Sequence, residues 1–193
     1  MSKKLYIISG CNGSGKTTAS YTILPEILDC TEFVNADEIA KGLSPFNPES
    51  TAIQAGRLML SRINELLNSG KNFAFETTLS TKSYVKFIEK AQENGYSVSL
   101  LFFWLNSHEL AIKRVKTRVQ EGGHDIPIDV IRRRYDNGLK NFFNLYQSIL
   151  DDWMLFDNSG DSYELIAEGA KKEEKVLNKE KWYSLKTNYG KNK

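Results

Sequence analysis

The segment that decides the fold reads Gly10-Cys11-Asn12-Gly13-Ser14-Gly15-Lys16-Thr17, and it matches the phosphate-binding loop pattern G-x-x-x-x-G-K-[ST]. A short apolar run, Leu5–Ile8, precedes the loop, and a segment that can open a helix, Thr17–Leu24, follows it. With glycine at about 7% of residues, the four fixed positions coincide by chance in less than about 1% of chains of this length. The sequence therefore predicts a nucleoside triphosphate site between a buried strand and a helix.

The residues of this loop suit a triphosphate for separate chemical reasons. Glycines let the backbone wrap an anion, so that consecutive N–H groups and the helix N-terminus point at the phosphates. Lys16 is expected to reach the β- and γ-phosphates of ATP, and the Thr17 hydroxyl to bind Mg²⁺. The predicted nucleotide-binding residues are Asn12, Gly13, Ser14, Gly15, Lys16, Thr17 and Thr18.

Composition predicts a single globular domain over residues 1–193, since 40% of the residues are hydrophobic and 26% are charged. The net charge of +2 offers no electrostatic case for a nucleic-acid partner. Cys11 and Cys30 form neither a metal-ligand spacing nor a disulfide framework, which favours a reduced, cytoplasmic setting.

The first residues weakly resemble a lipoprotein signal, because Lys3 and Lys4 precede an apolar run and Cys11. That run is shorter than the roughly 7–15 residues of a signal peptide, and the strand and loop already account for it. No apolar run approaches the roughly 20 residues of a membrane span. We therefore expect neither export nor a membrane location.

Two acidic residues follow predicted strands. Asp37 comes shortly after Thr31–Val34, and Glu76 directly follows Phe73–Phe75. Ligands of open α/β sheets bind beyond the carboxyl ends of the strands, so both acids are expected beside the phosphate loop. Asp37 would accept a proton from an attacking hydroxyl or hold the substrate, unless Asn35 or Asp37 merely caps a short helix. Glu76 would orient Mg²⁺ through water or bind substrate hydroxyls, and the alternative is a surface or capping carboxylate.

The next helix, Glu49 to Asn68, contributes one further candidate. Its predicted inner stripe consists of Ile53, Gly56, Leu60, Ile63 and Leu67. Gly56 within this stripe suggests close packing. Arg57 at its border could reach a substrate, although a solvated arginine is the plainer interpretation. The candidate substrate-binding residues are thus Asp37, Arg57, Glu76 and Thr78.

A basic pair of helices is predicted to form a lid over about residues 107–135. Ser107 caps the first helix, the Gly122-Gly123 segment breaks it, and the second helix runs from about Ile128 to Asp152. Cations on two helices joined by a hinge could close over the γ-phosphate, whereas the alternative is a solvated basic face that touches nucleic acid. The candidate lid residues are Arg114, Arg118, His124, Arg132 and Arg134.

The C-terminal part is predicted to be an appendage over about residues 160–193. It follows a strand at Trp153–Asp157 and reads as an edge hairpin, a short helix at Lys179–Leu185 and a frayed polar tail from Lys186.

Taken together, these motifs resemble the zeta-toxin family of phosphate-loop kinases, especially its compact relatives. The resemblance rests on Gly10–Thr17, Val34–Asp37, Phe75–Thr78, Arg114 with Arg118 and Gly122-Gly123-His124, Arg134-Tyr135, and Asp157–Ser159. It implies a three-layer α/β fold with a five-stranded parallel sheet of order 2-3-1-4-5. It also implies ATP-dependent phosphorylation of a hydroxyl on a UDP-linked amino sugar such as UDP-N-acetylglucosamine.

By the same resemblance, Thr17 helps to hold ATP·Mg²⁺ and Glu76 matches a substrate-binding acid. The implied catalytic residues are Lys16, Asp37, Arg118 and Arg134. The Gly-Gly-His-Asp loop departs from the pattern of the toxins, and the long C-terminal extension of the larger toxins is missing, so other acceptors remain open: a nucleoside, an antibiotic or a polynucleotide 5′ end. An ATP-gated regulatory module without catalysis and a partner antitoxin protein are the further alternatives.

Overall fold

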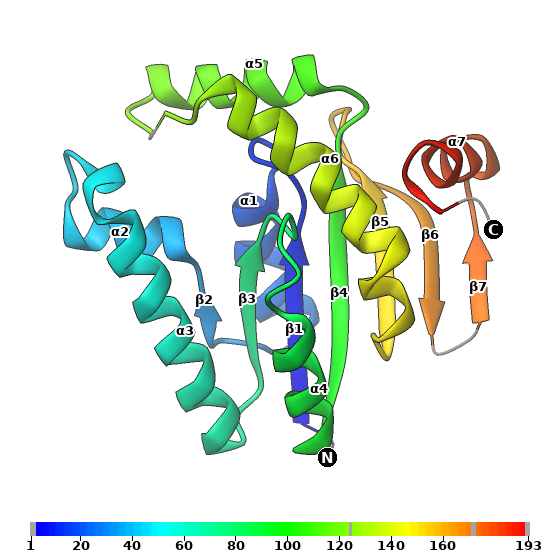
Figure 1. Cartoon of the computed structure of the whole chain (residues 1–193), viewed down its shortest axis with the longest axis horizontal. Helices are drawn as coiled ribbons and strands as arrows, with labels where there is room; N and C mark the ends of the chain where they lie inside the picture. Colours follow the sequence, from blue (N-terminus) through cyan, green and yellow to red (C-terminus); the bar gives the residue numbers. More distant parts are fainter. Residues whose placement is uncertain (1–2, 124, 171–172, 192–193) are drawn as a thin grey trace.

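The structure, a computed structural model, describes residues 3–123, 125–170 and 173–191. Its strands form one sheet in the order β2-β3-β1-β4-β5-β6-β7 (Figure 1). The five parallel strands are β1 (Lys3–Ser9), β2 (Phe33–Val34), β3 (Phe73–Thr77), β4 (Tyr96–Trp104) and β5 (Asp152–Asp157). The antiparallel pair is β6 (Glu164–Ala170) and β7 (Glu173–Val176). The expected α/β fold and the order of its parallel strands are confirmed, but the sheet has seven strands because the hairpin joins its edge through β5.

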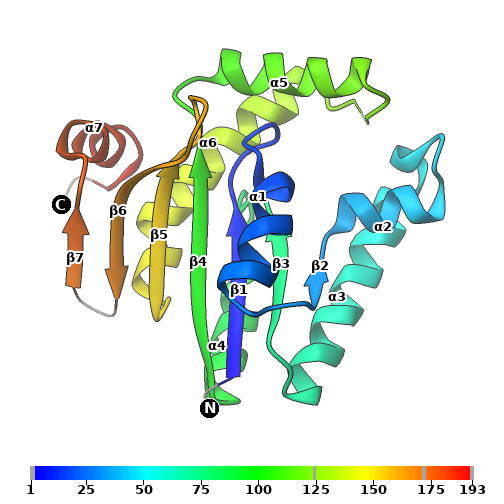
Figure 2. The ribbon, with the colours of Figure 1, turned by 180° about the vertical axis from the view of Figure 1, so that it is seen from behind.

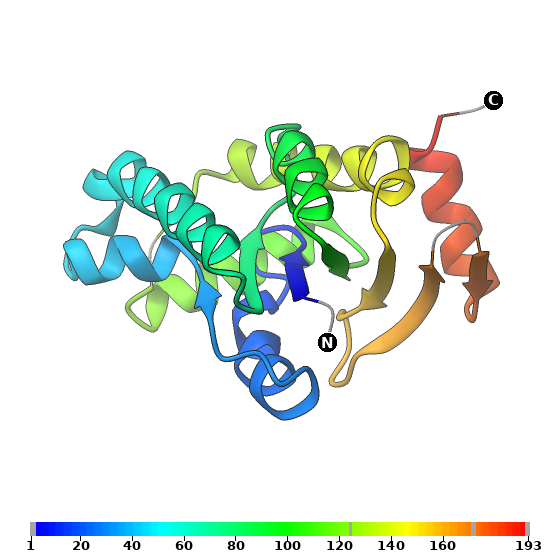
Figure 3. The same ribbon diagram turned by 90° about the horizontal axis from the view of Figure 1, so that it is seen from below.

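Helices cover both faces of this sheet. The α-helices of the described residues are α1 (Lys16–Thr22), α2 (Ala36–Leu43), α3 (Ala52–Ser69), α4 (Val85–Glu93), α5 (His108–Gln120), α6 (Ile128–Asn144) and α7 (Lys179–Tyr189). A π-helical segment at Ile23–Ile27 (η1) continues α1, and short 3-10 helices lie at Pro48–Thr51 (η2) and Tyr146–Ser148 (η3). α3, α4 and α6 lie on one face of the sheet and α1 on the other, as the view from behind (Figure 2) and the view from below (Figure 3) show. None of the described helices is long and apolar enough to cross a bilayer.

The alternation of side chains along β1 divides the core into two clusters. Leu5 and Ile7 face α3, α4 and α6, whereas Tyr6 and Ile8 face α1. Because β1 lies between β3 and β4, both of its faces are buried, as expected for a central parallel strand. This position carries the phosphate loop to the middle of the carboxyl edge of the sheet.

The predicted inner stripe of α3 was wrong in its first half. Ala55 and Met59 are buried, whereas Ile53 is 76% exposed and Leu60 is 49% exposed. A Cβ atom on Gly56 would meet no atom within 4 Å, so this glycine does not mark close packing. The N-terminal half of α3 packs against α2 rather than directly on the sheet, and this contact sets which face is buried.

Two helices in the C-terminal half end at other residues than the sequence predicted. The helix expected to reach Asp152 ends at Asn144, and α7 continues to Tyr189. Asn144 Nδ2 donates to Tyr189 O at 2.7 Å, and Lys191 N donates to Asn144 Oδ1 at 2.6 Å. The segment from Lys186 to Lys191 is therefore docked on α6 rather than frayed.

Candidate active site

The phosphate loop is held in shape by backbone conformations that suit glycine. Gly10 has φ +140° and Gly15 has φ +81°. A Cβ atom on Gly10 would lie 2.2 Å from Phe103 O, and one on Gly15 would lie 2.4 Å from Asn158 Nδ2. The loop is thus packed closely against β4 and the segment after β5, and a side chain at either glycine would force it open.

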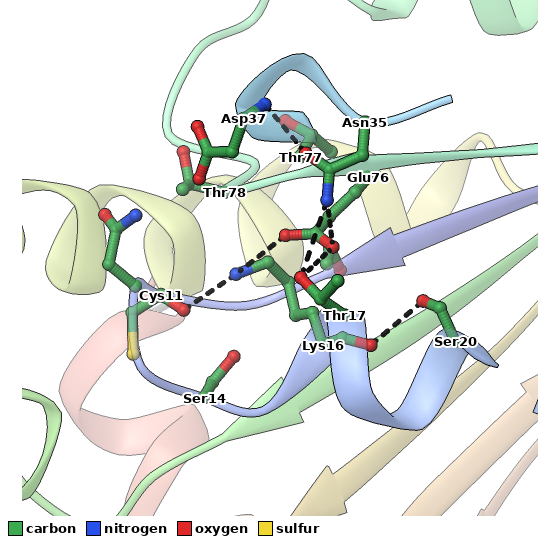
Figure 4. Close-up of polar contacts among 12 residues, drawn as sticks. Cys11, Ser14, Lys16, Thr17, Ser20, Asn35, Asp37, Glu76, Thr77 and Thr78 are labelled. Carbon is green, nitrogen blue, oxygen red and sulfur yellow. Dashed lines mark hydrogen bonds and ion pairs between the residues drawn. The ribbon is translucent and has the colours of Figure 1, made fainter. Parts of the chain in front are cut away.

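Lys16 and Thr17 both meet Glu76 at the carboxyl edge (Figure 4). Lys16 Nζ donates to Cys11 O at 2.8 Å and lies 3.6 Å from Glu76 Oε1. Thr17 Oγ1 donates to Glu76 Oε2 at 2.8 Å. The Lys16 and Glu76 side chains are only 6% and 10% exposed. Because β1 and β3 are parallel neighbours, their ends bring together the cation, hydroxyl and acid that the sequence placed on one edge.

Asn35 has a larger part in the site than the sequence suggested. Its Oδ1 accepts from Asp37 N at 2.8 Å and Glu38 N at 3.4 Å, so Asn35 is the N-cap of α2. Its Nδ2 donates to Glu76 Oε2 at 2.9 Å and lies 3.5 Å from Thr17 Oγ1. One buried amide therefore both starts α2 and orients Glu76. Its position after a strand was the available signal, but only the capping half was predicted.

Substituting Asn35 by alanine should lower the free energy of unfolding by about 1 kcal/mol through the lost cap. The same change releases Glu76, so Mg²⁺-dependent nucleotide affinity should also fall. Ser107→Ala is the matched control, because Ser107 caps α5 by accepting from Leu110 N. Calorimetric unfolding and nucleotide titration would contradict this dual role if both variants bound Mg²⁺·nucleotide equally well.

A cavity of about 250 Å³ opens beside Lys16. It is lined by Asn12, Lys16, Asn35, Ala36, Asp37, Met59, Glu76, Thr77, Thr78, Ser80, Thr81, Tyr84 and Arg134. Asp37 lies in the first turn of α2, where the Asn35 cap leaves its carboxylate free to face the cavity beside Thr78 (Figure 4). A carboxylate, a phosphate-loop lysine and several hydroxyl groups therefore share one space on one side of the sheet.

The hydroxyl-bearing wall of the cavity is fixed by α6 and by the η3 segment that follows it. Asn141 Nδ2 donates to Leu79 O at 2.9 Å, and Tyr146 OH donates to Thr81 O at 2.7 Å. A Cβ atom on Gly138 would lie 2.7 Å from Thr78 O, so helix and wall are in close contact. Leu79 is buried with φ +57°, a strained conformation for leucine that these contacts hold in place. These contacts together fix the position of the cavity wall.

Arg134 is the predicted lid arginine that reaches the cavity. It lies on α6, and its Nη1 donates to Asn12 Oδ1 of the phosphate loop at 3.1 Å. Burial lowers the pKa of Arg134, and the charge of Asp37 partly opposes that shift. Arginine remains protonated even so, so α6 places a fixed positive charge over the loop and across from Asp37.

The other proposed arginines lie elsewhere. Arg114 Nη1 donates to Asn158 O at 2.8 Å, and Arg118 packs along Gly123, whose Cβ would lie 2.6 Å from Arg118 Cγ. Arg132 is largely exposed with Nη2 4.0 Å from Glu109 Oε1, and Arg57 is exposed on α3. These four residues do not line the cavity. His124 lies outside the described residues, and Thr18 is exposed on the first turn of α1.

Comparison with known protein sequences identifies the family of this chain. The sequence model of the zeta toxin family matches residues 1–168. The chain belongs to the zeta toxin family. It is 34% identical over 137 residues to an uncharacterized protein of Haemophilus influenzae, a match that covers 70% of this chain and 94% of that protein.

Several solved structures share the fold of this chain. A chain of the AvrRxo1-ORF1:AvrRxo1-ORF2 complex with sulphate ions superposes with TM-score 0.77 at 19% identity, covering 95% of this chain and 63% of that one. The same complex with ATP gives TM-score 0.74 over the same shares of both chains, again at 19% identity. A structure of the PezAT chromosomal toxin-antitoxin system of Streptococcus pneumoniae gives TM-score 0.67 at 16% identity, covering 100% and 80%. The chain thus spans 63% of the length of the AvrRxo1 chain that it matches. Sequence identities this low show a shared fold and nothing more.

Two oxygen-bearing side chains beside the loop have the donor chemistry that Mg²⁺ would need. The Thr17 hydroxyl and the Glu76 carboxylate are hard oxygen ligands 2.8 Å apart, which is the donor chemistry Mg²⁺ prefers. Cys11 offers no competing chemistry, because burial raises the pKa of its thiol to about 11 although Lys16 partly opposes the shift. The thiol is therefore protonated at neutral pH and is a packing residue rather than a nucleophile.

Proposed function

We propose that this zeta toxin family member is an ATP-dependent kinase that transfers the γ-phosphoryl group of ATP to a hydroxyl of a small molecule. The observation that carries the proposal is a single cavity lined by Lys16 of the phosphate loop and by the carboxylate of Asp37. Phosphoryl transfer requires a cradle for the triphosphate and a group that receives the proton of the attacking hydroxyl. Lys16 and Asp37, the candidates for these two parts, line the same cavity, which supports the proposal.

In this proposal, Asp37 accepts the hydroxyl proton while Lys16 and Arg134 balance charge on the phosphoryl oxygens. Arg134 is held over the loop by Asn12, so it is available without a large movement of α6. Residues of α5 and α6, about 107–135, would act as a lid that excludes water by closing further. Bound Mg²⁺ would supply charge neutralisation at the phosphates, and Thr17 and Glu76 are the residues that would hold it.

For the acceptor, we propose a UDP-activated amino sugar such as UDP-N-acetylglucosamine. The family resemblance supports this choice, and the hydroxyl side chains at Thr77, Thr78, Ser80 and Thr81 suit a sugar that offers several hydroxyl groups. Glu76 and Asp37 would accept hydrogen bonds from such a ligand. Nucleosides, antibiotics and polynucleotide 5′ ends are the competing acceptors.

The test is transfer of label from [γ-³²P]ATP to a panel of UDP-sugars, nucleosides, antibiotics and oligonucleotides. We expect labelling of a UDP-amino sugar, and Lys16→Ala should abolish both transfer and nucleotide binding because it removes the cation from the cradle. Labelling of another class of acceptor would replace the UDP-sugar proposal. ATP binding without transfer to any acceptor would favour an ATP-gated regulatory module instead.

A protein partner is also proposed, namely an antitoxin. Support comes from membership of the zeta toxin family and from the PezAT system, whose name describes a toxin with an antitoxin. We propose a cytoplasmic site of action, where ATP is abundant. Co-purification of the tagged chain from its own host, with and without ATP, tests for the partner.

A further inference from the structure

A second set of contacts reaches the phosphate loop from the segment after β5. Asn158 Nδ2 donates to Ser14 O at 2.8 Å, and Asn158 N donates to Trp104 O at 2.9 Å. The Asn158 amide also occupies the space beside Gly15, where a Cβ atom would come within 2.4 Å of Nδ2. Asn158 is thus anchored to the sheet on one side and to the phosphate loop on the other.

The hydrogen bond to Ser14 O also orients the N–H group of Gly15, because the two groups belong to the same peptide. In a trans peptide the carbonyl and the N–H point in opposite directions. Because Asn158 holds Ser14 O, the N–H of Gly15 is turned away from Asn158 and toward the inside of the loop. N–H groups there are the ones that bind phosphate oxygens. The Asn158 amide therefore sets the direction of one phosphate donor.

The chain on both sides of Asn158 is fixed by the buried carboxylate of Asp157. Asp157 is 5% exposed, and its Oδ2 accepts from Lys181 Nζ on α7 at 2.6 Å. Its Oδ1 accepts from both the N–H and the hydroxyl of Ser159, and the Ser159 hydroxyl accepts from Asn106 N at 2.8 Å. Burial raises the pKa of Asp157, but the hydrogen bonds from Lys181 and Ser159 outweigh it and lower the pKa overall. The carboxylate is therefore charged and tied on both of its oxygens.

Lys181 is well placed for this contact because α7 is anchored independently. Trp182 is fully buried and its ring stacks on Trp153 with centroids 5.4 Å apart. Lys181 Nζ also donates to Glu164 Oε2 of β6 at 2.5 Å. The position of the ammonium group therefore depends on the C-terminal appendage and not on the phosphate loop.

We propose that Asn158 and Lys181 are positioning residues for nucleotide binding, and that α7 sets the Ser14–Gly15 peptide of the phosphate loop through Asp157 and Asn158. This inference rests on the nucleotide binding proposed above. It gives the C-terminal appendage a role in the site although no residue of β6, β7 or α7 lines the acceptor cavity.

The test compares Asn158→Ala and Lys181→Met with Lys175→Met in the full chain. Lys175 is the matched control, because it lies in the same appendage and pairs only with exposed Glu168, at 3.1 Å, among the described contacts. Titration calorimetry with Mg²⁺·ATP should show affinity about three- to tenfold weaker for the first two variants and unchanged for the control. Lys181→Arg should restore most of the loss, and KM for ATP should rise while kcat at saturating ATP stays near wild type.

Unfolding temperatures separate positioning from general stability. If Asn158→Ala and Lys181→Met bind ATP as tightly as wild type, the inference is overturned, even if Lys181→Met unfolds earlier. If Lys181→Met does not fold, Asn158→Ala decides, since this side chain lies in a loop at the edge of the sheet. Failure of the wild type to bind ATP would overturn the proposed function as well, whereas normal wild-type binding with unaffected variants overturns this inference alone.

Discussion

Replacing Asp37 by asparagine is expected to lower kcat by about 10²- to 10⁴-fold, the usual contribution of a positioned general base. The change is nearly isosteric, and the Asn35 cap that places this turn of α2 uses the backbone N–H of Asp37 rather than its side chain. Nucleotide affinity should therefore stay close to wild type. Single-turnover transfer and calorimetric titration with Mg²⁺·ATP measure the two quantities separately.

Glu38→Gln is the control for this variant. Glu38 lies next to Asp37 in α2, pairs with Lys41 at 2.8 Å on the surface and does not line the cavity. Its neutralisation should leave turnover unchanged. A large loss of ATP affinity in Asp37→Asn, with kcat little altered, would show that Asp37 acts in binding and not as a base.

Truncating Arg134 to alanine is expected to reduce kcat by about 10³-fold or more, as for other arginines that stabilise the charge of a transferring phosphoryl group. Arg134 is suited to this part because it donates to Asn12 Oδ1 and lines the same cavity as Asp37. Arg134→Lys should recover only part of the rate, because lysine keeps the charge but loses the planar fork of donors. Rates are to be measured at saturating ATP, together with the unfolding temperature.

Arg132→Ala supplies the comparison on the same helix. Arg132 is largely exposed, with Glu109 4.0 Å away, so its loss should change kcat by less than about twofold. Equal effects of the two substitutions would mean that α6 contributes only a diffuse positive field. An Arg134→Ala enzyme within tenfold of wild type would remove Arg134 from the mechanism.

Local sequence signals predicted those parts of the fold that depend on neighbouring residues. The continuous apolar run of β1, which is buried on both faces, and the glycines that follow it predicted the strand and the loop. The local geometry of a helix was less predictable than its position. Pro25 has no N–H to donate, and the α-helical bonding of α1 gives way to the π-helical segment η1 at Ile23.

The hydrophobic pattern of α3 predicted the wrong buried residues, because this helix packs against two different surfaces. The apolar residues of α3 fit a single stripe through Ile53 and Leu60, yet Ala55 and Met59 are the buried ones. The first half of α3 packs on α2, whose position depends on the buried Asn35 after β2. Hydrophobic patterns indicate that a helix has an inner face, but the packing partner decides which residues form it.

The phosphate loop and the two acids at the edge of the sheet could be predicted from the sequence, because strand, glycines and carboxylates follow one another closely along the chain. Which arginine reaches the cavity depends on tertiary contacts instead: Arg134 donates to Asn12 across 122 residues of sequence, while Arg114 donates to the carbonyl of Asn158. The contacts that connect Lys181 with the phosphate loop, through Asp157 and Asn158, also join residues that are far apart in the sequence. Such contacts depend on how distant elements dock, and no local pattern of residue types encodes their direction.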